Sequence, residues 1–493
     1  APSSPRAGMS AQQDKHGELP TMEDQINAVG FGRFHILAVT TFILFIISDG
    51  MELVVTNVIW RAMPVEEWGG DDSMRALLVS LSFSGFVVGA IIGGQLGDTF
   101  GRKPILYAHT MVFVPLSIAS ATSESFYQLA VTRFLIGISM GLVLPTSVAL
   151  MAELSPCNVR SRLILLIPGL AYAVGQVIVL TVGIVLMGYY GWNCEKCSWW
   201  RGMLVAGVVP DVVAVLMVYL YIPESPRFLL SQGRTAEAEA IIRSIAETNG
   251  TESQLLHQGA IRPVKEEHDK AEASMEAWQL MGELFKPPMN RILPLVVGIW
   301  SLLAVGLFSQ SFAYPVLLER DPTITAFDQY WLMIQLAFIE IPGLVVLIWA
   351  LEGTHVGRRE ILLVLSLASV VVAGIMIMIS DKGTTWLHLG SMGLRLMVVL
   401  PYEAMYIFAA ELLPTSHRNL GLSLGNGATK LVAALMPLVL MPLIHLWGAS
   451  VFLVILLAEV LAAVLVWVSP HTDDVLYDCV EEMPKTVNES APL

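Results

Sequence analysis

Long runs of apolar residues alternate with short polar segments along the 493 residues of this chain. Each run is close to the roughly 20 residues with which an α-helix crosses the hydrocarbon core of a bilayer. Because a helix satisfies its own backbone hydrogen bonds in lipid, the pattern predicts an all-α membrane protein. The twelve predicted spans are Phe34–Trp60, Ala76–Leu96, Ile105–Ala121, Tyr127–Ala152, Leu163–Gly188, Met203–Ile222, Leu293–Leu317, Tyr330–Leu351, Ile361–Ile379, Trp386–Ala410, Leu420–Ile444 and Val451–Val468.

A polar stretch after the sixth span divides the chain into two halves of six helices. We predict a disordered tail over 1–33, an N-terminal half over 34–222, a linker with short helices over 223–291, a C-terminal half over 292–468 and a second tail over 469–493. The first tail is rich in Ser, Pro and Gln, a composition that buries too little apolar surface to order the chain.

The positions of Lys and Arg predict the orientation, because short cytoplasmic loops carry an excess of positive charge. With the N-terminus in the cytoplasm, 19 of the 28 basic residues fall in cytoplasmic segments, 6 in external segments and 3 inside spans. An even number of spans returns the C-terminus to the same side. We therefore expect a monomer in the lipid bilayer with both termini cytoplasmic, in the plasma membrane or in an intracellular vesicle membrane.

Composition and motifs argue against several other classes of protein. Charged residues make up 14% of the chain, against about 25% in soluble proteins. The positive charges lie in loops rather than in one basic patch, so no nucleic acid is expected. No G-x-x-x-x-G-K-[ST] loop occurs, and the ten His residues show no paired metal spacing. Cys194 and Cys197 lack further ligands nearby, which leaves a local disulfide or two free thiols. We expect no metal, no cofactor and no enzymatic activity.

Two landmarks of the first half recur in the second half. The loop Leu96–Lys103 after span two resembles the loop Leu351–Arg359 after span eight, with their Gly-Arg pairs 256 positions apart. Span four ends at Glu153 and span ten at Glu411, 258 positions later, and each Glu is followed by an Arg seven residues on. Two landmarks at nearly one offset indicate an internal repeat of six spans.

These segments resemble the major facilitator superfamily. Gly97–Lys103 is similar to the signature between helices two and three of that family. Pro223–Phe228 is similar to the signature after helix six of its sugar porters and organic ion transporters. The resemblance implies the major facilitator fold, with twelve transmembrane helices in two six-helix halves related by an axis along the membrane normal. It also implies transport by alternating access.

Further segments resemble the synaptic vesicle glycoprotein 2 family and the organic ion transporters. They are Asp49–Glu52 in span one, Tyr190–Trp192 and Ser198–Arg201 before span six, and Lys430–Ala434 in span eleven. The large luminal loop of that glycoprotein family is replaced here by the short segment 319–329. Its luminal binding roles are therefore not expected.

The resemblance implies a cytoplasmic gate, in which loop charges hold the two halves together while the outside is open. The matching residues are Gly97, Asp98, Gly101, Arg102, Lys103, Glu153, Arg160, Gly357, Arg358, Arg359, Glu411 and Arg418. The second loop has Gly353 where Asp98 aligns loosely, so we expect its latch to be weaker.

Two carboxylates lie near the middle of span one. A charge at this depth costs about 2.5–3.5 kcal/mol on insertion scales, so such residues are functional candidates. Asp49 and Glu52 are three residues apart and share one helix face, and one of two close carboxylates should hold a proton. They are a candidate proton site. The open alternative is that one of them pairs with a basic residue and only stabilises the bundle.

Lys430 lies about ten residues into span eleven. In the related organic ion transporters, a basic residue at a similar place goes with anionic substrates. The resemblance therefore implies an organic anion or a carboxylate-bearing metabolite as substrate. A second interpretation stays open, in which Lys430 only neutralises Asp49 or Glu52 across the cavity.

Other polar residues inside the spans are weaker candidates. Arg133 and Arg395 either bind substrate or extend to the interface, the commoner behaviour near a helix end. Glu340 and Glu403 are mid-membrane and are candidates for further pairs, whereas Glu459 is expected to be structural. The residues that either line a cavity or pack in the core are Tyr172, Gln176, Gln310, Tyr314 and Gln335.

The leading functional hypothesis is a secondary active transporter of a small organic solute, with protons as a candidate coupling ion. The alternative is a membrane receptor or scaffold that has the shape of a transporter and carries out no transport.

Overall fold

The computed structural model describes residues 19–65, 67–68, 70–157, 159–160, 167–191, 198–261, 282, 286–287, 289–353, 356–413 and 418–470. These residues form α-helices and short 3₁₀ helices, with no strand among them. Twelve helical segments in this part of the chain are long and apolar enough to cross a membrane. The prediction of an all-α protein with twelve spans is confirmed.

The first six spans form the N-terminal half. They are α2 (Arg33–Val58) continued by η1 (Ile59–Ala62), α3 (Asp72–Phe100), α4 (Arg102–Ala121), α5 (Phe126–Leu154), α7 (Ile167–Tyr190), and α8 (Trp199–Ala206) continued by α9 (Val208–Tyr221). The sixth span is interrupted at Gly207, where Pro210 in the next turn has no backbone N–H to donate.

The last six spans form the C-terminal half. They are α13 (Met289–Leu318), α14 (Ala326–Gly353), α15 (Arg358–Ile379) with η4 (Ser380–Lys382), α16 (Thr384–Leu412), α17 (Arg418–Leu446) and α18 (Ser450–Val468). Short helices between the halves are α10 (Pro226–Ser231), α11 (Thr235–Asn249), η2 (Glu252–Gln254) and η3 (Leu256–Gly259). The predicted linker therefore does contain short helices.

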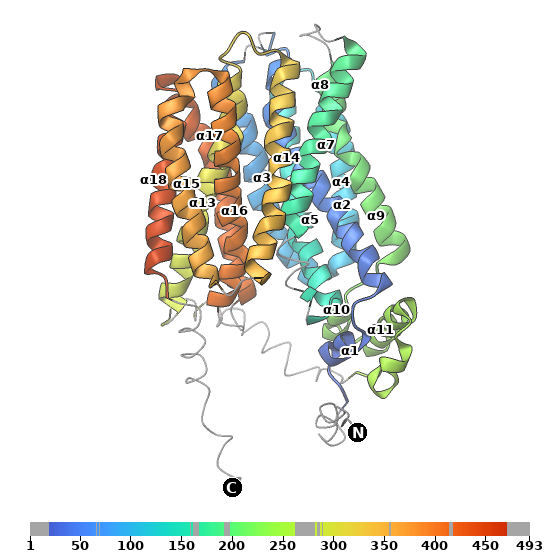
Figure 1. Cartoon of the computed structure of the whole chain (residues 1–493). Helices are drawn as coiled ribbons and strands as arrows, with labels where there is room; N and C mark the ends of the chain where they lie inside the picture. Colours follow the sequence, from blue (N-terminus) through green and yellow to red (C-terminus); the bar gives the residue numbers. More distant parts are fainter. Residues whose placement is uncertain are drawn as a thin grey trace, which may run out of the picture.

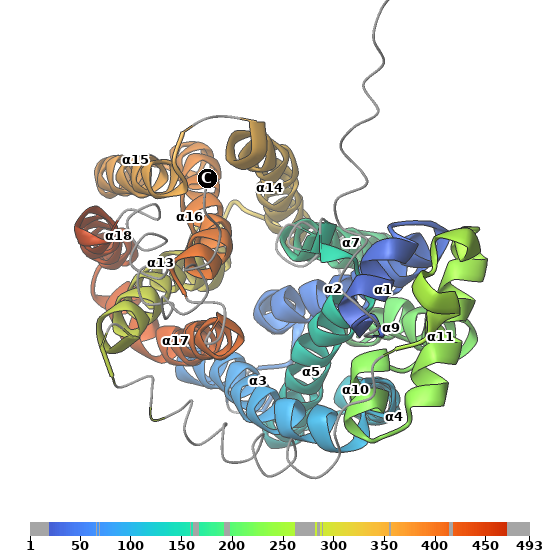
Figure 2. The ribbon, with the colours of Figure 1, turned by 90° about the horizontal axis from the view of Figure 1, so that it is seen from below.

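The two halves stand side by side as separate bundles (Figure 1). They adjoin along two helix pairs, α3 with α17 and α7 with α14, which is also visible from below in Figure 2. We call the end that carries α1, α10 and α11 the α11 end, and the end that carries η1 and η4 the η1 end. The first span begins and the last span ends at the α11 end (Figure 1).

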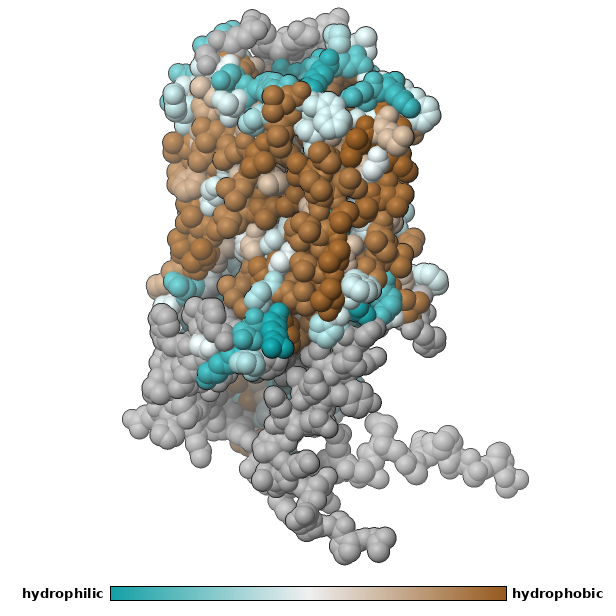
Figure 3. Space-filling model, turned by 90° about the vertical axis from the view of Figure 1, so that its left-hand side faces the viewer, coloured by the Kyte–Doolittle hydropathy of each residue, from teal (hydrophilic) through white to brown (hydrophobic). Residues whose placement is uncertain are grey.

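The surface matches a bilayer. A broad apolar belt runs across the face seen in Figure 3, and hydrophilic residues gather above and below this belt. Large apolar side chains are exposed on the outer helices, for example Tyr219, Trp349 and Val371. In water such a surface would be unfavourable, so the protein is a multi-pass membrane protein.

Small residues bring α3 and α5 into close contact. A side chain on Gly137 would collide with the backbone of Ser82, and one on Gly141 with the backbone of Phe86. Glycines at this spacing allow a neighbouring membrane helix to approach closely. The tight contact fixes the position of Arg133, one turn before Gly137.

The expectation of a disordered tail over 1–33 is wrong for its second part, which forms α1 (Met22–Val29). Thr21 and Asp24 cap this helix reciprocally. The Gln25 amide is fully buried and donates to the carbonyl oxygens of Leu256 and Ala260, at 2.7 and 2.8 Å. A capping box and one buried polar anchor therefore order a segment whose overall composition is polar. Residues 1–18, the tail beyond 470, Cys194 and Cys197 lie outside the described residues.

Candidate functional site

A cavity of about 1740 Å³ lies between the two halves. Its lining reaches from Glu23, Asp98 and Arg160 at the α11 end to Asn57 and Phe312 near the η1 end. Glu23 and Asp98 are exposed, with side-chain exposures of 55% and 78%. The cavity therefore opens at the α11 end.

Hydrogen bonds between the halves close the η1 end. The Arg75 guanidinium of α3 forms an ion pair of 2.6 Å with Glu319, which follows α13. Arg75 also donates to the side-chain and backbone oxygens of Asn57, at 3.3 and 3.0 Å. Asn57 donates in turn to the carbonyl oxygen of Ser311 across the interface, at 2.9 Å, and the amide of Gln329 donates to Glu319 at 2.9 Å. This closure was not predicted from the sequence, because Arg75 and Glu319 fall outside the predicted spans and belong to no motif.

The gate residues of the first loop lie at the α11 end and bond within their own half. Arg102 forms ion pairs of 3.0 Å with both Asp98 and Glu153. The backbone N–H groups of Arg102 and Lys103 donate to the carboxylate of Glu224, at 3.0 and 3.1 Å. A positive φ of 96° at Gly101 turns the chain here.

The first-loop contacts hold together the N-terminal half without reaching the other half. Arg102 also donates to the carbonyl oxygen of Gly97 at 2.9 Å. Glu224 belongs to the Pro223–Phe228 signature, so two motifs that the sequence analysis singled out meet at this point.

The second loop is built in a similar way. Arg358 forms an ion pair with Glu411 inside the C-terminal half, and Arg359 donates to the carbonyl oxygen of Val466 at 3.2 Å. Gly357 precedes α15 as its N-terminal flanking residue. The side chain of Arg418 lies outside the described residues.

Arg160 takes a partner that the sequence did not suggest. Its guanidinium forms an ion pair of 3.0 Å with Glu23 of α1, and the Cys157 thiol donates to the same carboxylate at 2.9 Å. These two hydrogen bonds, first the thiol and then the guanidinium, hold the pKa of Glu23 below its usual value of 4.5.

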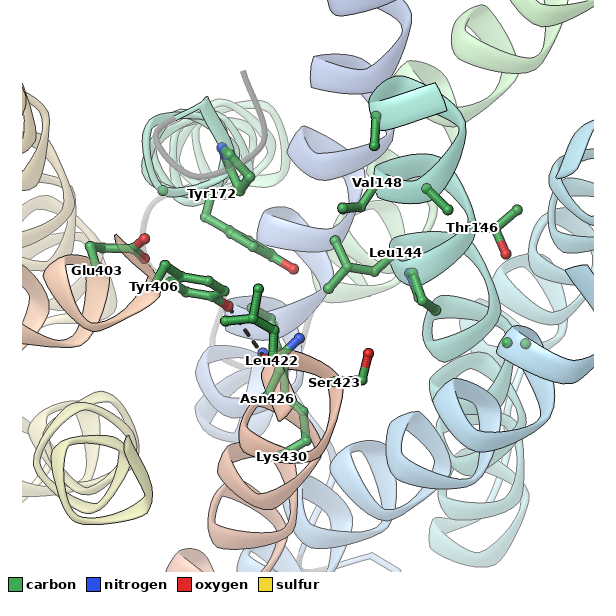
Figure 4. Close-up of a pocket in the computed structure, with 18 of the residues that line it drawn as sticks. Leu144, Thr146, Val148, Tyr172, Glu403, Tyr406, Leu422, Ser423, Asn426 and Lys430 are labelled. Carbon is green, nitrogen blue, oxygen red and sulfur yellow. Dashed lines mark hydrogen bonds between the residues drawn. The ribbon is translucent and has the colours of Figure 1, made fainter. Parts of the chain in front are cut away.

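Charged and aromatic side chains from both halves converge at mid-cavity. Figure 4 shows Tyr172 of α7, Glu403 and Tyr406 of α16, and Lys430 of α17 around this part of the cavity. The Lys430 ammonium stands over the ring of Phe86 at 5.2 Å and over a second ring, that of Phe308, at 5.5 Å. In the described part of the chain Lys430 has no ion-pair partner, so its charge is available to a ligand.

Glu403 faces Lys430 across the same space. Its carboxylate lies against Gly169 of α7, whose missing side chain leaves room for it. Asn426 accepts a hydrogen bond from Tyr406 at 3.3 Å, which is the dashed line in Figure 4. The centre of the cavity thus offers one positive pole, one negative pole and aromatic walls.

Arg395 and Glu340 form a second charged group in the cavity wall. The ion pair measures 2.6 Å, and both side chains are at most 7% exposed. Arg395 also donates to the hydroxyl of Ser311 at 2.5 Å and, across the two halves, to the amide oxygen of Gln176 at 3.4 Å. An extension of Arg395 to the membrane interface is therefore wrong, because its hydrogen-bond partners lie inside the bundle.

Arg133 is likewise buried rather than extended to the interface. It forms an ion pair of 2.6 Å with Glu52, and the two side chains are 1% and 3% exposed. Its Nε atom donates to the hydroxyl of Ser120 at 2.9 Å. Glu52 and Arg133 line a separate pocket of about 30 Å³ beside the main cavity.

Asp49 and Glu52 have different surroundings despite their spacing. Glu52 is neutralised by Arg133, whereas Asp49 is 2% exposed and its Oδ2 atom has no hydrogen-bond partner among the described residues. The charges that face Asp49 are those of His109, Asp211, Lys430 and Glu52. Asp49 therefore keeps the features of a candidate proton site, while Glu52 matches the alternative of a carboxylate paired with a base.

The remaining polar candidates divide into two groups. Tyr172 and Gln176 line the cavity. Gln310 donates to the carbonyl oxygen of Ser391 at 2.7 Å, and Tyr314 and Gln335 both bond to His388. Gln310, Tyr314 and Gln335 therefore bond inside the C-terminal half, although the amide oxygen of Gln310 has no partner among the described residues. Glu459 is fully buried on α18, away from the cavity.

Comparison with known proteins assigns the family. The family described as sugar (and other) transporter matches residues 22–480. This chain belongs to that family. The human organic cation/carnitine transporter 2 is 28% identical over 395 residues, which are 79% of this chain and 65% of the relative. The synaptic vesicle 2-related protein of Bos taurus is 25% identical over 449 residues, 85% of this chain and 75% of the relative.

Solved structures confirm the major facilitator fold. One similar structure is the partially occluded inward open conformation of the xylose transporter XylE from E. coli, with a TM-score of 0.68 at 17% identity. The match covers 89% of this chain and 98% of the XylE chain. The suspected branch is confirmed by these relatives, of which one is named as an organic cation/carnitine transporter and the other as a synaptic vesicle 2-related protein. This chain spans only 65% of the length of the human relative.

Proposed function

We propose that this protein is a secondary active transporter that moves a small, carboxylate-bearing organic solute by alternating access. The observation that carries the proposal is a cavity between the halves that is closed at the η1 end and open at the α11 end. A binding site that reaches one side at a time is what alternating access requires. The relatives named as transporters of organic cations and carnitine support organic ions as the substrate class.

Lys430 supports a carboxylate as one substrate group. A buried ammonium without an ionic partner is costly, and a bound carboxylate would compensate it with charge-assisted hydrogen bonds. In the second interpretation of the sequence, Lys430 only neutralises carboxylates of span one. Lys430 does face Asp49, but no ion pair joins them in the described part of the chain, and the Lys430 ammonium stands over two aromatic rings. Glu403 would accept a positively charged or hydroxyl group of the same solute.

Protons are the proposed coupling ion, with Asp49 as the site. Asp49 is buried and does not itself line the cavity, so its ionised form is strongly unfavourable unless a positive charge faces it. Binding of a substrate carboxylate to Lys430 removes the positive charge that faces Asp49, and this favours uptake of a proton. Substrate and proton would then be loaded together.

The α11 end is proposed to face the cytoplasm, as the distribution of Lys and Arg predicts. Cysteines placed at Pro64 and Asp72 should then react with an impermeant reagent from outside, whereas one placed at Glu252 should not. The Asn249 sequon should stay unglycosylated. Glycan on Asn249 would overturn this orientation.

The deciding experiment for transport is flux into proteoliposomes. The purified protein is reconstituted, and uptake of radiolabelled organic anions, zwitterions and cations is compared with and without an inward proton gradient. We expect saturable uptake of a carboxylate that the gradient increases. Binding without flux for every solute would favour the alternative of a receptor or scaffold without transport.

A further inference from the structure

A second titratable cluster lies inside the N-terminal half, outside the cavity. His109 of α4 and Asp211 of α9 are 2% and 0% exposed, and neither lines the cavity. The Nε2 atom of His109 is 2.8 Å from Oδ1 of Asp211. The ring of Phe113 stacks on the imidazole at 5.4 Å, and Phe45 meets it edge-on at 6.0 Å. The pair is thus enclosed by aromatic rings.

The hydrogen bonds of His109 determine how many protons the pair holds. Its Nδ1 atom is 2.8 Å from the carbonyl oxygen of Ser139. A carbonyl oxygen only accepts, and the nearby Ser139 hydroxyl, 3.0 Å from Nδ1, has the carbonyl oxygen of His109 as its own acceptor at 3.1 Å. We therefore assign a hydrogen to Nδ1. The short contact from Nε2 to Asp211 then needs a second proton, either on the imidazole or on the carboxyl group. In both cases the pair has one proton more than a neutral imidazole with an ionised carboxylate.

This extra proton makes the pair neutral as a whole. Loss of the proton would leave the Nε2 lone pair facing an ionised carboxylate in an apolar part of the membrane, where an unpaired charge is costly. The proton is therefore held tightly, and its affinity depends on the charges nearby.

Asp49 supplies such a charge. Phe45, which contacts the His109 ring, is one helical turn before Asp49 on α2. His109 and Asp211 are among the charges that face Asp49. Asp49 and Asp211 each have an Oδ2 atom that is buried and without a hydrogen-bond partner in the described part of the chain. These features place two incompletely satisfied carboxyl groups around one imidazole.

The other groups around this cluster are few. Asp49 of α2 faces the pair, and Ser139 of α5 contributes its carbonyl and hydroxyl oxygens. On the cavity side, Asp49 faces Lys430, Glu52 and Tyr172, and Glu403 faces Lys430. A change of charge at Lys430 is therefore felt first by Asp49 and, behind it, by the pair.

We propose that His109 and Asp211 form a second proton-binding site, which lies outside the cavity and titrates together with Asp49. The inference deepens the proposed proton coupling and rests on that function for its transport arm. Groups coupled in this way release their protons in steps that belong to the set and not to one residue. The pair acts on transport through Asp49, so its members are positioning residues and not part of the substrate site.

The C-terminal half offers a matched control. Glu459 of α18 is also fully buried on the last helix of its half, beside α15 as Asp211 is beside α4. Its two carboxylate oxygens have no hydrogen-bond partner among the described residues, and they lie against Gly306. Glu459→Gln removes a comparable buried acid that has no imidazole partner.

The test that needs no transport is an infrared titration of the full chain in lipid nanodiscs. Difference spectra between about pH 5 and 9, the range in which a His partner titrates most readily, are recorded for the protein and for His109→Gln and Asp211→Asn. We expect imidazole and carboxyl bands that vanish in the respective variants. Asp49→Asn should move their midpoint to lower pH by about one unit, which is a tenfold weaker proton affinity. Glu459→Gln should leave it unchanged.

Two results would overturn the proposal: bands of the pair that do not change with pH, or a midpoint that Asp49→Asn leaves in place. A double variant, His109→Gln with Asp211→Asn, guards against misfolding of the single variants, because two amides keep a neutral hydrogen bond without a titratable proton. Substrate uptake by the double variant should lose most of its dependence on pH, whereas substrate exchange at equal pH should remain. If His109 and Asp211 have only a structural role, the double variant will show the same pH dependence of uptake as the unaltered protein. If the unaltered protein transports nothing, the proposed function fails, and the infrared result still decides on the pair.

Discussion

The closure at the η1 end makes a quantitative prediction for Arg75→Ala. Arg75 is 1% exposed and Glu319 is 20% exposed. Breaking a buried pair costs about 3–5 kcal/mol when the remaining charge stays buried. Glu319 has some contact with solvent and keeps the hydrogen bond from Gln329, so we expect about 2 kcal/mol. This corresponds to a shift of about 30-fold in the equilibrium towards opening at the η1 end.

The assay measures the distance between spin labels on the two halves at that end. Labels at Ser73 and Lys382, both exposed, are introduced after replacement of the four native cysteines. Arg75→Ala should enlarge a longer-distance population. Arg201→Ala is the control, because Arg201 bonds to Ala121 within its own half. An unchanged distance distribution in folded Arg75→Ala protein would refute the assignment of Arg75 and Glu319 as the closing contact.

Three further predictions concern substrate selection, the gate and α1. Lys430→Ala should weaken apparent affinity for the anionic substrate about 30-fold, from about 2 kcal/mol of a lost charge-assisted hydrogen bond, and Lys430→Asp should favour cations in competition assays. Rescue of anion flux by neutralising Asp49 as well would defeat the selector role. Asp98→Asn should slow exchange with thermal stability nearly unchanged, because exposed pairs contribute about 0–1 kcal/mol; unaltered exchange would remove its gate role. The lowered pKa of Glu23 means that its hydrogen bonds from the Cys157 thiol and from Arg160 stabilise α1 docking above pH 4.5, and this stabilisation is lost as pH falls from 4.5 through the lowered pKa. The rate of hydrogen exchange at the backbone amides of 22–29, corrected for its intrinsic pH dependence, should therefore rise below pH 4.5 in the unaltered protein. Glu23→Gln should remove this pH dependence.

The sequence predicted the helices well because membrane spans need long apolar runs. The charged residues of the two repeated loops also make ion pairs in the structure. The partners of the intramembrane charges were harder to predict. Arg133 bonds to Glu52, which is 81 positions away, and only the packing of α3, α5 and α2 brings the two together.

The residues that were missed share one property. Arg75, Glu319, His109 and Asp211 have polar partners on distant helices and belong to no motif. Asp211 and His109 had a usable signal, since both are ionisable residues inside predicted spans. Arg75 and Glu319 had none, because charges at the ends of spans are ordinary.

The central claim is that a proton at Asp49 drives uphill transport by this cavity. The most direct measurement compares gradient-driven uptake with exchange at equal pH, for Asp49→Asn and Glu52→Gln in proteoliposomes. We expect Asp49→Asn to lose accumulation driven by a pH gradient, and we expect Glu52→Gln to retain it, because Glu52 is paired with Arg133 and is not the proposed proton site. Asp49→Asn should keep exchange, which needs no net proton movement. If Asp49→Asn still accumulates substrate in proportion to the imposed pH difference, Asp49 is not the proton site and the proposed coupling is wrong.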